Sequence, residues 1–232
     1  MSLIEDIEKL RDDSVAALDA SHNYFTHTKT AWRLVQQFVR QGRQITIRNQ
    51  ETGSVVRETD LPGLAQEYIT GYLAEATFQH FVSLFEDFIG DFLRLWLNEF
   101  PESLSAKKLD FDVVLQCSDK VDIVRSVVDK QVASLQYDRV PKWFDYIQGI
   151  VDLGCPTADE IERVAEVKAS RDVLVHNKGI ANAIYVDKSM GRARLAVGEK
   201  VDVPEHYHRE SWQLVKKVIT DVSNAGMSRL QP

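Results

Sequence analysis

The strongest constraint on the fold of this chain is a run of large apolar residues with helical spacing between residues 64 and 100. They recur at intervals of three and four residues, which places them along one side of a helix. The stripe comprises Phe78, Phe81, Val82, Phe85, Phe88, Ile89, Phe92, Leu93 and Trp96. The acidic residues Glu86, Asp87 and Asp91 lie off this stripe. We therefore predict one long helix that ends before Pro101 and whose stripe forms core or subunit contacts.

The same spacing predicts helices on both sides of this one. They cover residues 4–41, 119–137, 141–150, 157–176 and a last segment that starts at Pro204 or Glu205. The first helix is expected to break or bend near Ser21-His22-Asn23 and to end at Gly42. Thr157 followed three residues later by Glu160 is a capping box, which is typical of a helix start. Asn177-Lys178-Gly179 is typical of a helix end.

Two segments alternate apolar and polar residues instead. Residues 44–59 alternate around Thr52-Gly53, which predicts a short hairpin or a mobile insertion. Residues 184–203 alternate around Met190-Gly191, which predicts a hairpin or an irregular loop. The whole pattern predicts a single domain over residues 1–232, an all-α antiparallel helical bundle with small β-hairpin-like insertions.

Composition limits the classes of protein to which this chain can belong. Hydrophobic residues make up 44% of the 232 residues, which is enough for a sizeable core. The acidic start lacks the apolar run of a secretory signal, and no stretch approaches the roughly 20 apolar residues of a membrane span. Cys117 and Cys155 are far apart, so we expect reduced thiols, a cytoplasmic protein and no metal site. Glycine-rich phosphate loops are missing from the sequence, and we expect no cofactor.

The charge is unevenly distributed. The net charge of -7 argues against a nucleic-acid coat protein or a membrane-surface protein. Residues 168–200 are the exception that we single out, since they carry seven Lys or Arg residues against three acids. The RNA-binding candidates in this segment are Lys178, Lys188, Arg192 and Arg194. The alternative is an ordinary solvated surface segment.

The basic segment contains Arg171 and His176, five residues apart in the last turns of a predicted helix. Arginine can hold a phosphoryl charge with a rigid fork of donors, and histidine can move a proton near neutral pH. The end of a helix favours a cationic imidazole, and such a histidine acts as a base in one protonation state and as an acid in the other. The two residues together suit the cleavage of a phosphodiester without a metal.

The spacing of the pair leaves three interpretations open. Five residues rotate a helix by about 500°, so the two side chains point roughly 140° apart. Arginine is long enough to curl across, or two such helices that meet at a two-fold axis could complete each other's sites. The structural alternative is that Arg171 pairs with Glu166 or Asp172, and that His176 is an ordinary residue at a helix end.

The residues around this pair resemble a known signature. The segment Arg171-Asp172-Val-Leu-Val-His176-Asn177-Lys178-Gly179 is similar to the pattern of the HEPN superfamily, in which an arginine, a polar residue and a few apolar residues precede His-Asn and a glycine. It looks most like the branch labelled RiboL-PSP-HEPN or MAE_28990-like. An earlier phenylalanine-rich helix with a Phe-Glu pair is also typical there, and Phe85-Glu86-Asp87-Phe88 is similar to it. The resemblance covers about residues 64–225 and does not explain residues 1–60.

The resemblance implies an all-helical dimer in which two Arg/His pairs meet in one cleft. Many members are metal-independent endoribonucleases, often toxins or phage-defence effectors. By this resemblance Arg171 and His176 are the catalytic pair, and Asp172 and Asn177 take the supporting positions. Asparagine is common in the family where this chain has Asp172, and an acid beside a phosphate weakens RNA binding.

Two functions are therefore expected. The first is a metal-independent endoribonuclease that cleaves RNA by 2′-OH attack as a homodimer, with an antitoxin or another protein as a possible partner. The second is a non-catalytic dimeric helical module that binds a protein partner, a nucleotide or RNA, which the acidic bulk charge and Asp172 favour. A metal hydrolase comes third, because His206 and His208 are two residues apart and fit no zinc motif. We expect both histidines at the solvated start of the last helix.

Overall fold

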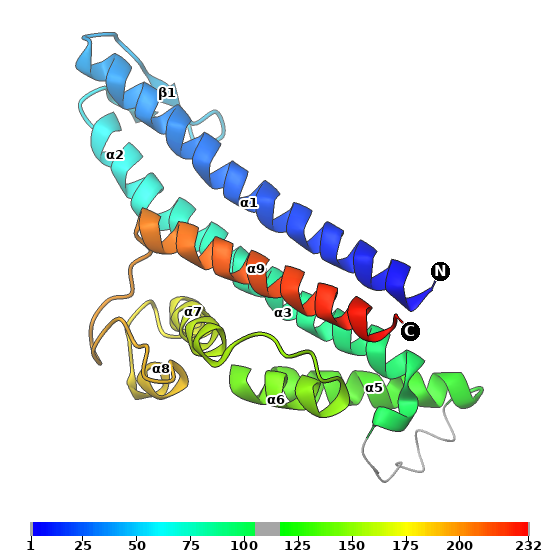
Figure 1. Ribbon diagram of the computed structural model, residues 1–232. Helices are drawn as coiled ribbons and strands as arrows, with labels where there is room; N and C mark the ends of the chain where they lie inside the picture. The colour runs from blue at the N-terminus through cyan, green and yellow to red at the C-terminus, as the bar shows by residue number, and fades with distance from the viewer. Residues whose placement is uncertain (1, 105–116, 232) are drawn as a thin grey trace.

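The computed structural model describes residues 2–104 and 117–231 and has the predicted all-α architecture with a small hairpin (Figure 1). In this part of the chain, long helices that run side by side are α1 (Leu3–Arg40), α3 (Ala74–Glu99) and α9 (Glu205–Arg229). The direction of α1 is opposite to that of α3 and α9 (Figure 1). The other helical elements are α2 (Leu61–Glu67), the π-helix η1 (Tyr68–Leu73), the 3-10 helix η2 (Pro101–Ser103), α5 (Lys120–Gln136), α6 (Val140–Ile150), α7 (Ala158–His176) and α8 (Ala183–Lys188). None of the described helices is both long and apolar enough to span a membrane.

The apolar stripe predicted between residues 64 and 100 is confirmed as the centre of the core. Every residue of the stripe is buried, and α3 packs against α1, α5, α7 and α9. The helical segment already begins at Leu61, because the missing N–H of Pro62 is not needed in the first turn. It ends at Glu99, before Pro101, as predicted.

No break occurs near Ser21-His22-Asn23, where a break or bend is predicted, because α1 runs through this segment without interruption. The polar side chains find partners on the neighbouring helices. Ser21 is buried, and its hydroxyl lies 3.1 Å from Nδ1 of His80. The ring of His22 stacks on the ring of Trp212, with the centroids 4.1 Å apart. Contacts with α3 and α9 therefore keep helical a segment whose residues locally favour a turn.

The hairpin predicted within residues 44–59 is confirmed. Strand β1 (Ile47–Arg48) pairs antiparallel with β2 (Val55–Val56), and Ile47 lies opposite Val56. The side-chain oxygen of Asn49 accepts hydrogen bonds from the backbone N–H groups of Glu51 and Thr52, which closes the turn.

The second alternating segment differs in part from its prediction, since most of residues 189–203 are irregular as expected. Residues 183–188 form α8 rather than a strand or an irregular loop. Asn182 caps this helix by accepting a hydrogen bond from the backbone N–H of Tyr185 at 2.9 Å. The strand-like contact of this region lies instead at its flanks, where Ile180 pairs with Lys200 in an isolated β-bridge. Six residues are too few for their apolar spacing to distinguish a helix from a strand.

The expectation that His208 is solvated is wrong, because its side chain is completely buried. Its Nε2 lies 2.7 Å from the hydroxyl of Thr77, which donates its only hydrogen to the carbonyl of Leu73. His208 therefore donates from Nε2, while its Nδ1 has no partner within the described residues. The ring packs against Phe25, with centroids 4.0 Å apart. Burial lowers the pKa of His208 to about 3, so the imidazole is neutral in the folded protein.

We predict that acid destabilises the fold through His208. A folded-state pKa of about 3, below the ordinary 6.5, makes its stabilising contribution complete above about pH 6.5 and progressively smaller as the pH falls toward 3. Between about pH 7 and pH 5 this group alone should remove about 2 kcal/mol from the free energy of unfolding. Urea denaturation at several pH values measures the slope.

The matched comparison is His208→Phe against His206→Gln. The phenylalanine variant should lose most of this pH dependence, while the variant at exposed His206 should keep the slope of the parent. The pKa of His22 is also lowered by burial, so some dependence remains in His208→Phe. Identical slopes in the parent and His208→Phe would contradict the assignment.

Candidate functional site

The helix α7 carries the candidate pair and has the predicted boundaries. It starts at a capping box in which Thr157 and Glu160 each bond to the backbone N–H of the other. It ends at His176 because Lys178 and Gly179 follow with left-handed backbones, at φ values of 54° and 73°. Gly179 adopts this conformation without steric cost. The sequence thus places a histidine at the last position of a sharply terminated helix.

Arg171 lies in a closed ring of alternating charges between α3 and α7. Its Nη1 lies 3.0 Å from Oδ1 of Asp172, and its Nη2 pairs with Oε2 of Glu86. Lys168 completes the ring, with its Nζ 3.1 Å from Oε1 of Glu86 and 3.1 Å from Oδ2 of Asp172. The four side chains are only 15% to 19% exposed. Two cations therefore neutralise two carboxylates in a site largely removed from water.

The ring shows which of the expected partners Arg171 has. The pairing with Asp172 is present, as the structural alternative predicts, but the second partner is Glu86 and not Glu166. The predicted supporting residue Asp172 thus binds the arginine instead of leaving it free. An arginine held by two carboxylates offers less of its charge to a phosphate than a free one.

His176 lies apart from Arg171, on the exposed side of α7. It lines a cavity of about 190 Å³ between α7 and α8, together with Asp172, Asn177, Asn182 and Lys188. Arg171 is not among the residues that line this cavity. Within one chain, the structure therefore brings His176 together with Asp172, Asn177 and Lys188, but it does not bring Arg171 into the same cavity.

The other predicted residues near His176 differ in whether their side chains are bonded to other groups of the protein. The side chain of Asn177 donates a hydrogen bond to the carbonyl of Ile180 and so stabilises the turn after the helix. Lys188 lies 3.6 Å from Asp172 and is 40% exposed. Lys178 is exposed and makes no ion pair within residues 2–104 and 117–231. The two lysines are the more available of the predicted RNA-binding residues.

A second buried acid, Glu166, fixes the segments that surround the end of α7. It accepts hydrogen bonds from Ser170 (2.7 Å), Tyr185 (3.1 Å), Tyr207 (2.8 Å) and Arg194 (3.2 Å). The guanidinium of Arg194 also lies over the ring of Tyr207, 3.5 Å from its centroid. Burial and the nearby carboxylate raise the pKa of Tyr207 well above its ordinary value, so its hydroxyl keeps the donor proton. Arg194 is thus a structural link between the loop after α8 and α9.

Arg192 is likewise engaged inside the protein. Its Nε lies 2.9 Å from Glu162 and its Nη2 lies 2.6 Å from Asp159, both on the first turns of α7. The excess of basic residues in 168–200 is therefore mostly balanced by carboxylates from other segments. The predicted positive surface is reduced in the folded protein to Lys178, Lys188 and the exposed Lys200.

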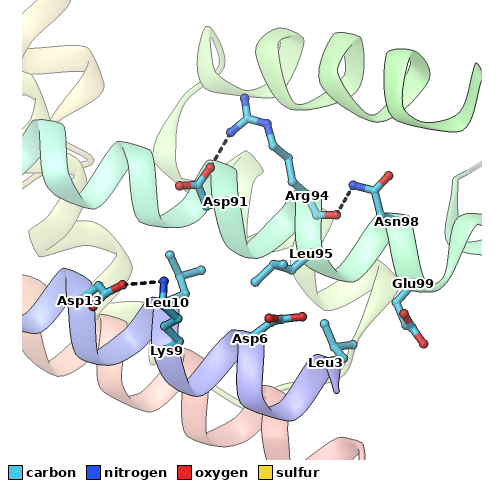
Figure 2. Close-up of a pocket in the computed structure, with 10 residues that line it drawn as sticks. All are labelled: Leu3, Asp6, Lys9, Leu10, Asp13, Asp91, Arg94, Leu95, Asn98 and Glu99. Carbon is cyan, nitrogen blue, oxygen red and sulfur yellow. Dashed lines mark hydrogen bonds and ion pairs between the residues drawn. The ribbon is translucent and has the colours of Figure 1, made fainter. Parts of the chain in front are cut away.

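A larger cavity, of about 580 Å³, lies between the N-terminal turns of α1 and the C-terminal turns of α3 (Figure 2). Leucines form its apolar part, and Figure 2 shows Lys9 paired with Asp13 and Arg94 paired with Asp91 at its edges. The residues that line it include no histidine or cysteine. It therefore offers neither a proton-transfer group near neutral pH nor a thiol nucleophile, and His176 is the better candidate for chemistry.

Comparison with known proteins adds no further assignment. No family model, curated protein or solved structure matches this chain. The described residues contain no group of three or more His, Cys, Asp or Glu side chains that could hold a metal ion. Cys117 and Cys155 are both free thiols. The site therefore has to be argued from its geometry alone.

Sequence reasoning does not predict the partners of the acids that organise the site. Glu86 and Lys168 were not singled out as partners of Arg171, although Glu86 follows a buried phenylalanine on the flank of the stripe. Glu166 is one of the few acids on the inner side of its helix, between the apolar residues Val164 and Val167. An acid flanked by core positions was the available signal in both cases.

We predict that Glu86→Gln lowers the free energy of unfolding by about 2 kcal/mol, because Lys168 and Arg171 then share one carboxylate in a partly buried site. Asp87→Asn is the matched control, since Asp87 is adjacent and exposed and makes no ion pair among the described residues. The control should change stability by less than about 0.5 kcal/mol. Urea denaturation of the three proteins gives the comparison, and equal effects of both substitutions would contradict the role of the ring.

Proposed function

We propose that this chain is a metal-independent endoribonuclease of the HEPN type that acts as a homodimer. His176 removes the proton from a ribose 2′-OH, whose oxygen attacks the adjacent phosphorus. The bond from phosphorus to the 5′-oxygen then breaks, and His176 of the partner subunit protonates that oxygen. The products are a 2′,3′-cyclic phosphate and a 5′-hydroxyl. Such cleavage in the cytoplasm suits a toxin or phage-defence effector, with an antitoxin as the controlling partner.

The observation that carries this proposal is the position of His176. Its imidazole is exposed at the end of α7, beside a cavity that also presents Asn182 and Lys188. An exposed histidine with a lysine close by offers both a proton-transfer group and a positive charge for a phosphate. The larger cavity between α1 and α3 has a lysine but no histidine.

Arg171 is assigned to the negative charge that develops on the phosphorane. Its guanidinium is held by Glu86 and Asp172, so the substrate phosphate has to displace one of these carboxylates. The remaining carboxylate would then orient the fork of the arginine toward the phosphate. Asp172 is the one expected to be displaced, because Lys168 remains close enough to neutralise it.

The proposed dimer is supported by apolar side chains that lie exposed around the site. Val175 and Ile180 flank the end of α7, and Ile184 lines the same cavity as His176. Exposed apolar residues that gather at one place are typical of a surface covered by another molecule. A second copy packed here would bring two His176 side chains toward one cleft and would exclude water from it.

A second candidate function is a dimeric helical module without catalysis. The observation that favours it is the complete pairing of Arg171, which makes the arginine a structural residue. In this case the exposed apolar residues near His176 bind a protein partner, and the imidazole moves no proton. The two candidates differ in the effect of removing the imidazole, which only the first one requires.

We predict that the purified protein cleaves RNA in excess EDTA and leaves DNA of the same sequence intact. His176→Ala should reduce the rate by at least about a hundredfold, because the proton transfers lose their base and acid. His206→Ala, which removes an exposed histidine at the start of α9, is the matched control and should retain the parent rate. Mass spectrometry of the fragments should find 2′,3′-cyclic phosphate ends.

Several results would contradict the ribonuclease. They are cleavage of DNA, a strict requirement for added Mg²⁺, or equal rates in the parent and His176→Ala. Binding of RNA without cleavage by any of the three proteins would favour the non-catalytic module.

We also predict that Ile184→Glu weakens the dimer by at least tenfold, because it places a charge in the proposed apolar interface. Val121→Glu is the matched control, since Val121 on α5 has the same exposed fraction of 62% and lies outside the proposed interface. Light scattering over a range of protein concentrations measures the change. A strictly monomeric parent protein would remove the dimer and the shared site with it.

A further inference from the structure

The arginines that are free of carboxylates gather at the end of α1 that is far from the N-terminus. Among the described residues, most arginines of this protein pair with an acid, whereas five make no ion pair. Those five are Arg40, Arg43, Arg48, Arg57 and Arg209. Four of the five therefore lie within one short stretch of the chain, at the end of α1 and in the hairpin (Figure 1).

Basic residues also outnumber acidic ones in the local sequence. Residues 20–50 carry five basic side chains and no acidic one, in a protein whose net charge is -7. The nearest acids along the chain, Glu51, Glu58 and Asp60, make no ion pair with any of these arginines in the part of the chain that the structure describes. This end of the molecule is thus a positive surface on an acidic protein, and it attracts anions over about a Debye length.

The hairpin presents two of the arginines on one face. The register pairs Arg48 with Val55 and Ile47 with Val56, so Arg57 lies diagonally across from Arg48 on the same side. Both arginines are exposed, while Ile47 and Val56 on the other side are half-buried. The hairpin therefore turns its apolar face inward and its guanidiniums outward.

A third free arginine continues a side of α1 that carries an aromatic ring. Trp32, Gln36 and Arg40 follow one another at intervals of four, so they lie along one side of the helix. Gln36 bonds to the carbonyl of Pro62 at 3.0 Å, which shows that this side faces α2. The fourth free arginine, Arg43, has its guanidinium 4.9 Å from the centroid of the Phe38 ring.

Exposed aromatic rings lie farther back along the same side of α1, at the level of Trp32. The ring of Trp32 meets that of Tyr68 edge-on at 5.3 Å, and Tyr68 meets Tyr72 at 6.1 Å. The two tyrosines belong to η1, and Tyr72 is 67% exposed. Short π-helical turns are frequent at functional sites. A side of the molecule that carries exposed rings and, farther along the same helix, unpaired guanidiniums has the two kinds of group that bind single-stranded nucleic acid, with arginines on phosphates and rings on bases.

We propose that this surface, defined by Arg40, Arg43, Arg48, Arg57, Tyr68 and Tyr72, binds single-stranded RNA. The arginines contact phosphates and the tyrosines stack on bases. Single strands are favoured over duplexes because only unpaired bases expose the ring faces that a tyrosine can stack on. That the nucleic acid is RNA rests on the proposed function. The surface would bind the RNA substrate at a distance from His176.

The test is fluorescence anisotropy with a labelled single-stranded RNA of about 20 nucleotides, in EDTA and in the His176→Ala background so that no cleavage occurs. We expect the single strand to bind at least tenfold more tightly than the same sequence as a duplex. Replacing the four arginines together by glutamine should weaken binding at least tenfold. It should also reduce the slope of log K against log salt by about 3, since each phosphate contact on a single strand contributes about 0.7.

Substitution of a tyrosine tests the contribution of stacking to affinity separately from that of charge. Tyr72→Ala should weaken binding about tenfold and leave the salt slope unchanged, because stacking releases no counterions. The control for the arginines replaces four exposed arginines elsewhere, Arg125, Arg163, Arg209 and Arg229, and so makes the same change in net charge. It should lower affinity less than threefold. Thermal melts of each variant confirm that it is folded.

Several outcomes overturn the proposal. They are no binding by the parent, equal binding of duplex and single strand, an equal loss in the control variant, or no effect of Tyr72→Ala. The last result together with a full arginine effect would indicate a surface for an acidic protein or another polyanion. The two proposals fail separately. Cleavage of RNA by the parent, with no effect of the arginine substitutions on binding, contradicts only this surface. Binding of RNA that depends on the arginines, with no cleavage by the parent, contradicts only the ribonuclease.

Discussion

The large apolar side chains of α3 are buried along the whole helix, and the other helices take their places by covering them. α1 and α9 cover one part of the stripe, while α5 and α7 cover another. The fit is close where α9 crosses α3, because a Cβ added to Gly226 would lie 3.0 Å from the ring of Phe92. A stripe of phenylalanines this wide cannot be left in water. The position of α7, and with it that of His176, therefore follows from the packing of α3.

The flank of the same helix also sets the electrostatics of the candidate site. Glu86 lies beside the stripe, so it meets α7 where Lys168 and Arg171 project toward α3. A positive charge in that position would be costly without a partner, because both cations are mostly removed from water. The ring of charges is thus a consequence of burying α7 against α3. It also holds the arginine of the pair in one orientation.

Much of the fold is predictable from periodicity and from local end signals. The stripe of α3, the capping box of Thr157 and Glu160, the left-handed end at Gly179 and the hairpin near Asn49 all depend on neighbours in the sequence. These signals fail where distant contacts decide the outcome. α1 does not break at Ser21-His22-Asn23 because α3 and α9 receive its polar side chains. α8 was too short for its apolar spacing to identify it as a helix.

The partners of the candidate residues could not be predicted from the sequence. The sequence identified Arg171 and His176 as neighbours, but Glu86 is far from Arg171 in the chain and no spacing rule connects them. The same limit applies to charge. The excess of basic residues in 168–200 suggested a positive surface, yet Arg192 and Arg194 are bound to carboxylates on α7. Charge counted along the sequence does not reveal which cations the fold neutralises.

When only unpaired cations are counted, the expected binding surface for an anionic polymer moves from the surroundings of Arg171 to the end of α1. The ring around Arg171 is close to neutral, so it attracts a phosphate only weakly from a distance. The free guanidiniums at the end of α1 attract it over about a Debye length. An enzyme that cuts RNA must both concentrate the polymer and release its products, and weak attraction at the reacting phosphate favours release. Under the proposed function, one surface that binds RNA and another that cleaves it would let an acidic protein both concentrate the polymer and release the products. Arg171 would then exchange a carboxylate for a phosphate only after the RNA is bound.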